Sequence, residues 1–330
     1  MQLAILGAGM VGRAMAIDLA SSYTVTSFDL SDGSLQLLSQ KNNRIKTIKA
    51  DLSDYGNYNS LLAGFDFVIS AVPGFMGYRT LEAIIRAKKN VVDISFFPEN
   101  ALELDRLAKD NDVTAIVDCG VAPGMSNLIL GYHNERMQVE NFVAMCGGLP
   151  VKRTMPFQYK APFSPVDVLE IYTRPTKIVV NGKVMTVPAL SDMEEINFDE
   201  VGTLEAFNTD GLRSLLHTMK IPNMKEKTLR YPGHIELIQS LKQAGFLDET
   251  PVSVNGVSIS PMQFTAALLF DQWKLGPEEP EFTIMRITVS NDEKIICYDL
   301  YDEYDPASGL SSMSRTTGYT CTAALELQIS

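Results

Sequence analysis

The sequence predicts a two-domain α/β protein in which a parallel sheet, wound on both faces by helices, precedes an α+β domain. Three observations support this prediction. Short apolar runs alternate with helical segments over the first 118 residues, as in a parallel sheet. A Gly-x-Gly-x-x-Gly motif follows the first run at residues 7–12. Beyond residue 127 hairpin signals replace the alternation, the strongest being Asn181-Gly182 between two β-branched runs.

The glycine motif predicts a dinucleotide-binding site of the Rossmann type. Gly7 permits a tight turn, Gly9 lets a pyrophosphate approach the backbone, and Gly12 lets the next helix pack against the strand. The free N–H groups at the start of that helix then face the phosphates. A glycine turn without a ligand is the alternative. The predicted cofactor contacts in this loop are Gly7, Ala8, Gly9, Met10, Val11 and Gly12.

Asp29 indicates which dinucleotide is bound. It ends the second β-branched run, about 20 residues after Gly7, where a carboxylate accepts hydrogen bonds from an adenosine ribose. Its negative charge would repel a 2′-phosphate, and residues 30–40 contain no Arg or Lys to receive one. The sequence therefore predicts NAD in preference to NADP.

The ends of the later strands supply further predicted cofactor contacts. Strands are expected at 43–51, 65–74 and 90–95, and each ends at the edge of the sheet where the ligand lies. An adenine ring is expected beside the first of these ends, and small residues leave space for the cofactor at the second. The predicted contacts are Asp51, Leu52, Ala71, Val72, Pro73, Asp93 and Ser95.

Periodicity and turn signals predict the remaining elements and the domain boundaries. Residues 1–127, completed by 306–330, form the predicted cofactor domain, and residues 128–305 form the second domain. A helix over 309–329 is expected to return to the first domain. Other helices are predicted at 13–20, 54–62, 81–87, 101–110, 209–219, 233–244 and 261–273, and other strands at 113–118, 140–145, 176–180, 183–187, 202–207, 227–231, 281–290 and 293–301.

The composition of the 330-residue chain argues against several classes of function. The formal net charge is -12 and no run of Lys or Arg interrupts it, which disfavours binding to nucleic acid or to an anionic membrane surface. The four cysteines stand far apart, so neither a metal site nor a disulfide framework is expected. No segment approaches the ~18 apolar residues of a membrane span, and the first apolar run is too short for a signal peptide. A cytoplasmic protein is expected.

Several short motifs lie in order along the chain. They are DCGVAPGMSN at 118–127, GGLP at 147–150, EIYTRP at 170–175, LEAF at 204–207, DGLRSL at 210–215, TLRYPGH at 228–234 and MSRTTG at 313–318. Together they resemble the saccharopine dehydrogenase-like family, and within it the lysine 6-dehydrogenase branch. The resemblance implies a Rossmann domain and a substrate domain whose sheet forms a homodimer interface. It also implies an amino acid as substrate and oxidation of the 6-amine of L-lysine by NAD.

The resemblance leaves two alternatives open. The saccharopine reductase branch, which reduces an imine with NADP(H), typically carries Asp before the Pro-Gly of the first motif, where this chain has Ala122. Residues 146–150 nevertheless resemble the reductase pattern, in which the cysteine, here Cys146, lies near the substrate. Relatives continue beyond the last motif, whereas this sequence ends at Ser330. A dinucleotide-binding sensor without turnover is therefore the second alternative.

Candidate residues for substrate binding follow from the chemistry of a lysine substrate. Its α-carboxylate requires a cation, and the planar fork of Arg grips a carboxylate with two hydrogen bonds. Arg230 and Arg213 are the candidates, with Arg174 third, because they lie in the motifs given above. Structural ion pairs are the alternative for all three.

Candidate proton-transfer groups are fewer. His234 begins a predicted helix, and an unperturbed imidazole pKa of ~6.5 suits a proton relay, although a helix cap is the alternative. Asp118 ends a predicted strand and could act as general base, or cap a helix instead. Cys146 could contact the substrate or simply pack in the core. His133 and His217 are expected on solvated faces.

Overall fold

The computed structural model describes residues 1–161, 165–276 and 279–330. The chain divides into two compact units. The first unit comprises Met1–Ile129, Arg213–Thr218 and Met313–Ser330, and the second comprises Leu130–Leu212 and Met219–Ser312. The sequence did not predict that residues 213–218 belong to the first unit.

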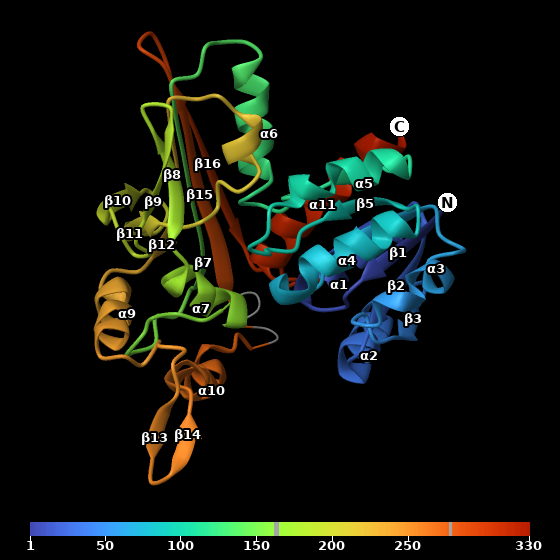
Figure 1. Cartoon of the computed structure of the whole chain (residues 1–330), viewed down its shortest axis with the longest axis horizontal. Coiled ribbons are helices and arrows are strands. Elements are labelled where there is room, and N and C mark those ends of the chain that lie inside the picture. The colour runs from blue at the N-terminus through green and yellow to red at the C-terminus, as the bar shows by residue number, and fades with distance from the viewer. Residues whose placement is uncertain (162–164, 277–278) are drawn as a thin grey trace. The chain divides into compact units, whose positions relative to one another are not determined.

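The first unit is built on a parallel sheet of six strands in the order β3-β2-β1-β4-β5-β6 (Figure 1). This is the doubly wound order of dinucleotide-binding folds, so the predicted fold class is confirmed. The strands are β1 (Gln2–Leu6), β2 (Thr24–Asp29), β3 (Lys46–Lys49), β4 (Phe67–Ser70), β5 (Asn90–Asp93) and β6 (Ala115–Ile116). The helices are α1 (Met10–Leu19), α2 (Asp32–Lys41), α3 (Tyr58–Leu61), α4 (Gly74–Arg86), α5 (Asp105–Asp110), α8 (Leu215–Thr218) and α11 (Ser312–Ile329), with short 3-10 turns η1 (Tyr55–Asn57) and η2 (Ala101–Leu104). Helix α6 (Met125–Asn134) begins in the first unit and ends in the second.

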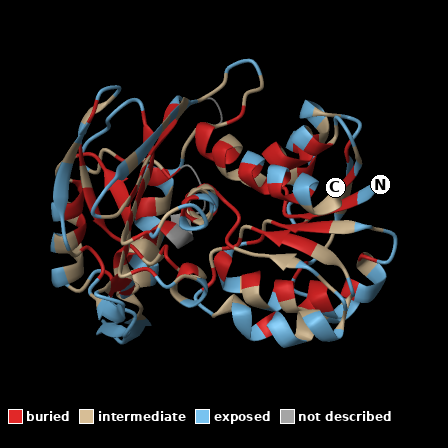
Figure 2. Ribbon diagram, turned by 90° about the horizontal axis from the view of Figure 1, so that it is seen from above, coloured by how far each residue is buried: buried red, intermediate tan, exposed pale blue. Residues whose placement is uncertain are grey.

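Helices cover both faces of this sheet because its strands are apolar on both sides. Leu3 and Ile5 pack in one core with residues of α1, α2 and α11. Ala4 and Leu6, which alternate with them along β1, pack in a second core with residues of α3, α4 and η2. Figure 2 shows the buried strands between helices whose outer faces are exposed. Burial on both faces explains why the strands appear in the sequence as continuous apolar runs.

The C-terminal helix α11 packs on α1, as predicted. The Thr322 hydroxyl donates a hydrogen bond of 2.6 Å to Asp18 of α1. A Cβ at Gly318 would lie 3.0 Å from the Met15 side chain, so the two helices are in close contact. Leu325 is fully buried in the same core.

The second unit is built on a mixed sheet of eight strands. Six form the path β10-β11-β12-β7-β15-β16, while β8 pairs with β12 and β9. The pair formed by β7 and β12 is parallel and the other pairs are antiparallel. The strands are β7 (Asn141–Pro150), β8 (Thr176–Val180), β9 (Lys183–Val187), β10 (Glu194–Phe198), β11 (Gly202–Asn208), β12 (Asn223–Arg230), β15 (Glu281–Ser290) and β16 (Ile295–Glu303), with a separate hairpin of β13 (Val252–Val254) and β14 (Val257–Ile259). The helices are α7 (Pro165–Thr173), α9 (His234–Gln243) and α10 (Pro261–Trp273).

Several predicted bounds are wrong. Only Leu215–Thr218 of the predicted helix 209–219 is helical, because Arg213 has a φ of +42° and Thr209 bonds to β12. Strand β7 continues to Pro150 instead of ending at 145, since Gly147 lets it pass close to Leu229. Helix α4 begins at Gly74 and not at 81, and β6 has only two residues. The sequence analysis did not identify α2, α6, α7, β10, β13 and β14.

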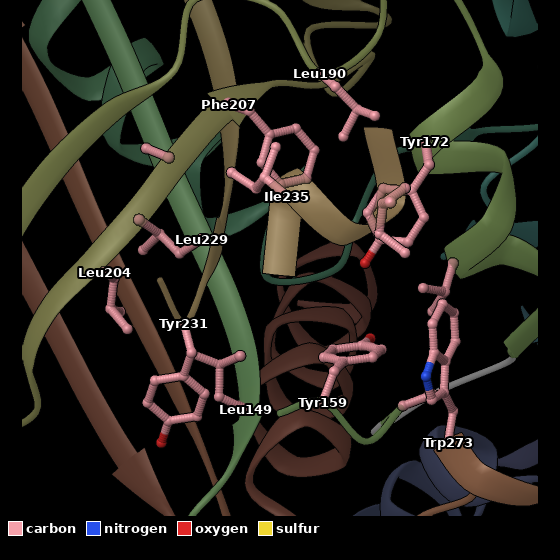
Figure 3. Close-up of a cluster of buried hydrophobic side chains, with 14 of the residues drawn as sticks. Leu149, Tyr159, Tyr172, Leu190, Leu204, Phe207, Leu229, Tyr231, Ile235 and Trp273 are labelled. Atoms are coloured by element: carbon pink, nitrogen blue, oxygen red, sulfur yellow. The ribbon is translucent and has the colours of Figure 1, made fainter. Parts of the chain in front are cut away.

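The core of the second unit is rich in aromatic residues. Figure 3 shows Tyr159, Tyr172 and Trp273 gathered at one side of a cluster that also contains Phe207 and Leu229. The ring centroids of Tyr159 and Trp273 are 5.4 Å apart and nearly perpendicular, a favourable edge-to-face arrangement. Among the residues that the structure describes, no helix has the length and apolar character needed to cross a bilayer.

The first glycine turn gives a test of this fold. A Cβ at Gly12 would lie 2.1 Å from the Gly7 carbonyl oxygen, whereas a Cβ at Gly9 meets nothing within 4 Å. Gly12→Ala should therefore destabilise the chain by about 1–3 kcal/mol through overpacking, and Gly9→Ala should leave the unfolding midpoint nearly unchanged while weakening dinucleotide binding. Urea unfolding and a fluorescence titration with NADH measure the two effects. Equal stability of the two variants would contradict this account.

Candidate functional site

The glycine turn leaves the start of α1 open to a ligand. Gly7 has a φ of +110°, which favours glycine, and a Cβ there would lie 2.5 Å from the Ala71 carbonyl oxygen. Gly9 precedes the helix and supplies no side-chain cap to its first N–H groups. With open space above Gly9, these donors and the helix dipole suit the pyrophosphate of a dinucleotide.

Asp29 lies at the carboxyl end of β2, but its carboxylate already accepts two hydrogen bonds. Its Oδ2 atom accepts from the Ala8 amide at 2.7 Å and its Oδ1 atom from the Ser31 amide at 2.8 Å. Each oxygen keeps a second lone pair for a ribose hydroxyl. The carboxylate thus also fixes the glycine loop, a role that the sequence did not reveal.

A lysine lies next to Asp29 in the sheet. The Cα atoms of Asp29 and Lys49 are paired in the register of β2 and β3. The Lys49 ammonium pairs with Asp32, and both side chains are exposed. Sequence reasoning considered only residues 30–40 as phosphate partners, so it missed this cation, which the sheet brings in from the next strand.

Strands β3 and β4 end at Lys49 and Ser70, earlier than predicted, and the predicted cofactor contacts follow them in the chain. Asp51 accepts hydrogen bonds from the Ser53 hydroxyl and amide, which lower the pKa of its carboxyl. Leu52 is buried and its carbonyl oxygen accepts from the Tyr58 hydroxyl at 2.9 Å. Ala71, Val72 and Pro73 follow β4, and Pro73 caps the start of α4.

Asp93 at the end of β5 is a fully buried carboxyl. It accepts hydrogen bonds from the Ser95 hydroxyl at 2.9 Å and the Ser95 amide at 3.2 Å. Burial raises the pKa of Asp93 to about 7, with a further contribution from the Asp118 charge, while hydrogen bonds from Ser70 and Ser95 oppose the rise. A carboxyl in this environment can exchange a proton near neutrality.

Asp118 and Arg213 form an ion pair within the first unit. Arg213 Nε lies 2.5 Å from Asp118 Oδ1, and the other carboxylate oxygen accepts from the Ser214 amide at 3.0 Å. Arg213 also donates to the Phe97 carbonyl oxygen and lies over the rings of Phe96 and Phe97. Because Asp118 neutralises Arg213, this arginine is less available to a substrate carboxylate than the sequence suggested.

Arg230 ends β12 as a buried cation. The residue is 2% exposed, its Nε donates to the Tyr172 hydroxyl at 2.9 Å, and its Nη1 donates to the Leu229 carbonyl oxygen at 2.9 Å. Its guanidinium carbon lies 4.3 Å from the centroid of the Tyr159 ring. Arg230 forms no ion pair with any residue described by the structure, and its Nη2 has no hydrogen-bond partner there.

His234 orients Arg230 through Tyr172. Since Arg230 only donates, the Tyr172 hydroxyl gives its proton to His234 Nε2, 2.9 Å away. His234 Nδ1 then donates to the Phe157 carbonyl oxygen at 2.7 Å, so the imidazole is neutral. Burial, together with the Arg230 charge, lowers the pKa of His234 to about 3. The expectation of an imidazole that titrates near 6.5 is therefore wrong.

Two more buried donors lie in the same aromatic core, one of them on Tyr159, whose ring Arg230 covers. The Tyr159 hydroxyl and the Trp273 indole nitrogen have no hydrogen-bond partner among the described residues. Figure 3 shows these two side chains beside one another, with the Tyr172 hydroxyl turned toward the same group. Buried polar groups are nearly always satisfied, so the unmet Arg230 Nη2 and the unmet hydroxyl of Tyr159, on whose ring Arg230 lies, are consistent with a site for an acceptor.

Cys146 lies in β7, beside Thr228 of β12 in the sheet register. Desolvation raises the pKa of its thiol to about 12, and the nearby Glu226 carboxylate adds to the rise while Arg230 opposes it. The thiol is therefore neutral at physiological pH. A neutral thiol can contact a substrate but is a poor nucleophile.

Comparisons with known proteins agree with this architecture. The family model described as the saccharopine dehydrogenase NADP binding domain matches residues 3–116. The one described as the saccharopine dehydrogenase C-terminal domain matches residues 120–330. The chain belongs to the saccharopine dehydrogenase family. This confirms the resemblance to the family that the motifs indicated.

Relatives within the family differ in length from this chain. The NADP-dependent, L-glutamate-forming saccharopine dehydrogenase of Pyricularia oryzae is 29% identical over 215 residues, covering 61% of this chain and 48% of the relative. The Saccharomyces cerevisiae enzyme of the same name is 26% identical, with coverages of 80% and 62%. The bovine mitochondrial alpha-aminoadipic semialdehyde synthase is 26% identical, with coverages of 58% and 22%. The chain thus spans less than two thirds of the length of these relatives.

A solved structure supports the fold. Apo saccharopine dehydrogenase (L-Glu forming) from Saccharomyces cerevisiae superposes with a TM-score of 0.77 at 20% identity, covering 99% of this chain and 91% of that one. At this identity the likeness concerns the fold alone.

The structure gathers the predicted site residues into two groups, one in each unit. The first unit holds the predicted cofactor contacts together with Asp118 and Arg213, and the second holds Cys146, Arg230 and His234. Arg174, the third candidate for the substrate carboxylate, forms an ion pair with Glu170 one helical turn away. His217 is exposed as predicted. The prediction of a solvated His133 is wrong, since it is buried and bonded to Tyr298 at 2.9 Å.

Sequence reasoning missed Tyr172, Tyr159, Glu226 and Lys49. Tyr172 lies in the EIYTRP motif that indicated the family, but nothing in the sequence pairs it with Arg230. Glu226 could have been found, because it lies two and four residues before Thr228 and Arg230 and therefore on the same strand face. Tyr159 precedes α7 in an irregular segment, where no periodicity indicates its direction.

The buried imidazole predicts how acid affects stability. His234 has a pKa near 6.5 when unfolded and about 3 when folded, so the unfolded state binds more protons between these values. Stability should therefore be fully present above pH 6.5 and fall as the pH drops toward 3. Urea unfolding of the second unit, followed by fluorescence of the single tryptophan Trp273, should show a weaker fall between pH 7 and 5 in His234→Gln than in the wild type.

The exposed His217 provides the control, since His217→Gln should keep the wild-type slope. If His234→Gln also kept that slope, the imidazole would not be the buried neutral group that the hydrogen bonds indicate.

Proposed function

We propose that this protein is an NAD-dependent oxidoreductase that acts on the CH–NH2 group of an amino acid. The observation that carries the proposal is Arg230, a buried guanidinium that forms no ion pair with the described residues, although Glu205 is its neighbour on β11 and instead accepts from the Gly233 amide. An uncompensated buried charge is costly, and a substrate carboxylate would compensate it. A planar guanidinium held in place by Tyr172 suits this bidentate recognition.

The dinucleotide would bind to the first unit. The open α1 terminus at Gly9 fits the pyrophosphate, and Asp29 keeps lone pairs for the ribose hydroxyls. When bound, NAD supplies a hydride acceptor at its nicotinamide ring. The strand ends at Asp93 and Ser95 provide a buried proton-exchanging carboxyl at the same edge of the sheet.

The residues of the chain have distinct roles in this proposal. Arg230 binds the substrate carboxylate, while Tyr172 and His234 hold the guanidinium in position. Asp93 is better suited than Asp118 to take up a proton, because its pKa is close to neutrality whereas Asp118 is committed to Arg213. Two carboxyl groups whose surroundings give them different pKa values commonly take different roles, one as acid and one as base.

The finer proposal for the substrate is L-lysine, oxidised at its 6-amine. The motif resemblance to the lysine 6-dehydrogenase branch supports it, as does Ala122 in place of the aspartate typical of saccharopine reductases. Amine oxidation needs a carboxylate anchor distant from the reacting carbon, which Arg230 would provide.

Replacing Arg230 tests the anchor. Arg230→Ala should raise the KM for L-lysine by about a hundredfold, the factor expected when a charge-assisted pair of 2–3 kcal/mol is lost, and leave NAD affinity unchanged. Production of NADH followed by absorbance, and a separate NAD titration, give both quantities. The exposed Arg106→Ala serves as control. A purified chain that produces no NADH with lysine or other diamino acids would contradict the proposed activity.

A second candidate function is imine reduction with NADPH, the reaction of the saccharopine reductase branch, and the names of two relatives specify NADP(+). Lys49 favours it, because a short side-chain movement could exchange Asp32 for a 2′-phosphate. Residues 146–150 also resemble the reductase pattern.

Binding of NADH and NADPH separates the two candidates. We expect NADH to bind at least about tenfold more tightly, because the fixed Asp29 carboxylate repels a 2′-phosphate, and Lys49→Met to leave NADH affinity unaltered. Tighter NADPH binding that is lost in Lys49→Met would instead support the second candidate. Fluorescence titration of each reduced dinucleotide measures the difference.

A further inference from the structure

A buried carboxyl group and a buried guanidinium group lie on one face of β12. Glu226, Thr228 and Arg230 are two positions apart along the strand, so their side chains point to the same side of the sheet. Glu226 is 7% exposed and Arg230 is 2% exposed. About 13 Å of strand separates their Cα atoms, at roughly 3.3 Å per residue.

Glu226 lacks a cationic partner within the described part of the chain. Its carboxylate accepts a hydrogen bond from the Thr209 hydroxyl, which also lies 3.0 Å from the Thr228 hydroxyl. A Cβ at Gly211 would lie 2.5 Å from its Oε2 atom, so the backbone approaches the carboxyl closely. No ion pair to Glu226 occurs among the residues described.

Hydrogen bonding alone does not explain a carboxylate at this position. A neutral Gln would accept from Thr209 in the same way and would avoid the cost of burying a charge. Burial raises the pKa of Glu226 to about 7, while hydrogen bonds from the Thr209 hydroxyl and the Gly211 amide oppose the rise. A cation beside the carboxyl would favour its ionised form. Glu226 and Arg230 are close enough that both act on the Cys146 thiol. An ionisable carboxyl and a cation on one strand face, neither in an ion pair with a described residue, match the two charged ends of a small zwitterionic molecule.

We propose that Glu226 is a specificity-determining residue that binds the far-end amine of the substrate in its protonated form, before the amine loses its proton and reacts, while Arg230 binds the substrate carboxylate. This inference rests on the proposed function and deepens it, because it names the substrate class as amino acids with a second, positively charged amine. A substrate with a carboxylate at that end would be repelled by Glu226. The site thus selects diamino acids over dicarboxylic amino acids.

The test compares three ligands of similar length by calorimetry with the NAD-saturated chain. L-lysine carries an amine at the far end, L-norleucine a methyl group, and L-2-aminoadipate a carboxylate. The wild type should bind lysine most tightly and aminoadipate least. In Glu226→Gln, lysine affinity should fall at least about tenfold, as expected for loss of a charge-assisted hydrogen bond, and aminoadipate affinity should rise.

Two variants separate charge recognition from a structural role. Glu226→Asp keeps the charge and should retain more of the preference for lysine over norleucine than Glu226→Gln does. Glu249→Gln makes the same chemical change at an exposed position and should match the wild type. Fluorescence of Trp273 shows whether each variant keeps the folded core of the second unit.

The results distinguish this inference from the proposed function. If Glu226→Gln folds and keeps the wild-type order of affinities, the inference is overturned even where the chain oxidises lysine. If the wild type binds the ligands in the expected order and Glu226→Gln inverts it, the inference stands whether or not NADH is produced. A variant with a damaged fold would bind every ligand more weakly, so a rise in aminoadipate affinity would indicate loss of the Glu226 charge.

Discussion

The buried guanidinium of Arg230 is the constraint on which the second unit depends. A cation with almost no exposed surface must be held by neighbours, and here the neighbours form a single hydrogen-bonded series through Tyr172 and His234 to the backbone of Phe157. Each donor in this series determines the direction of the next. The aromatic core around Trp273 therefore does more than exclude water, since it fixes the orientation of a charged group.

In the first unit, the glycine turn leaves backbone N–H donors free at the N-terminus of α1. Gly7 and Gly12 allow the turn to close, and the Asp29 carboxylate fixes it from the neighbouring strand. The same carboxylate therefore stabilises the loop and faces the ligand. This double role explains why an acid at the end of β2 has structural consequences as well as an effect on cofactor choice.

Much of this architecture could be predicted from the sequence, because it depends on local signals. The glycine turn, the apolar parallel strands and the Asn181-Gly182 hairpin each have a characteristic short pattern. The predictions were wrong where tertiary contacts decide the conformation. Residues 209–213 have a helical pattern, yet the bond from Thr209 to Glu226 and the positive φ of Arg213 keep them extended or turned.

The candidate site could be predicted only in part for the same reason. Residue type and motif indicated Arg230 and His234, but the imidazole pKa depends on burial that no sequence pattern reveals. Pairing of Arg213 with Asp118 joins positions 95 residues apart. Lys49 and Asp29 come together through strand register, which follows from the assembled sheet and not from sequence distance.

The packing of α11 against α1 has a consequence for biosynthesis. The core beneath the glycine turn includes Cys321 and Leu325 together with Met15 and Leu19. The dinucleotide unit therefore cannot complete its interior until α11, which follows the second unit along the chain, has been synthesised.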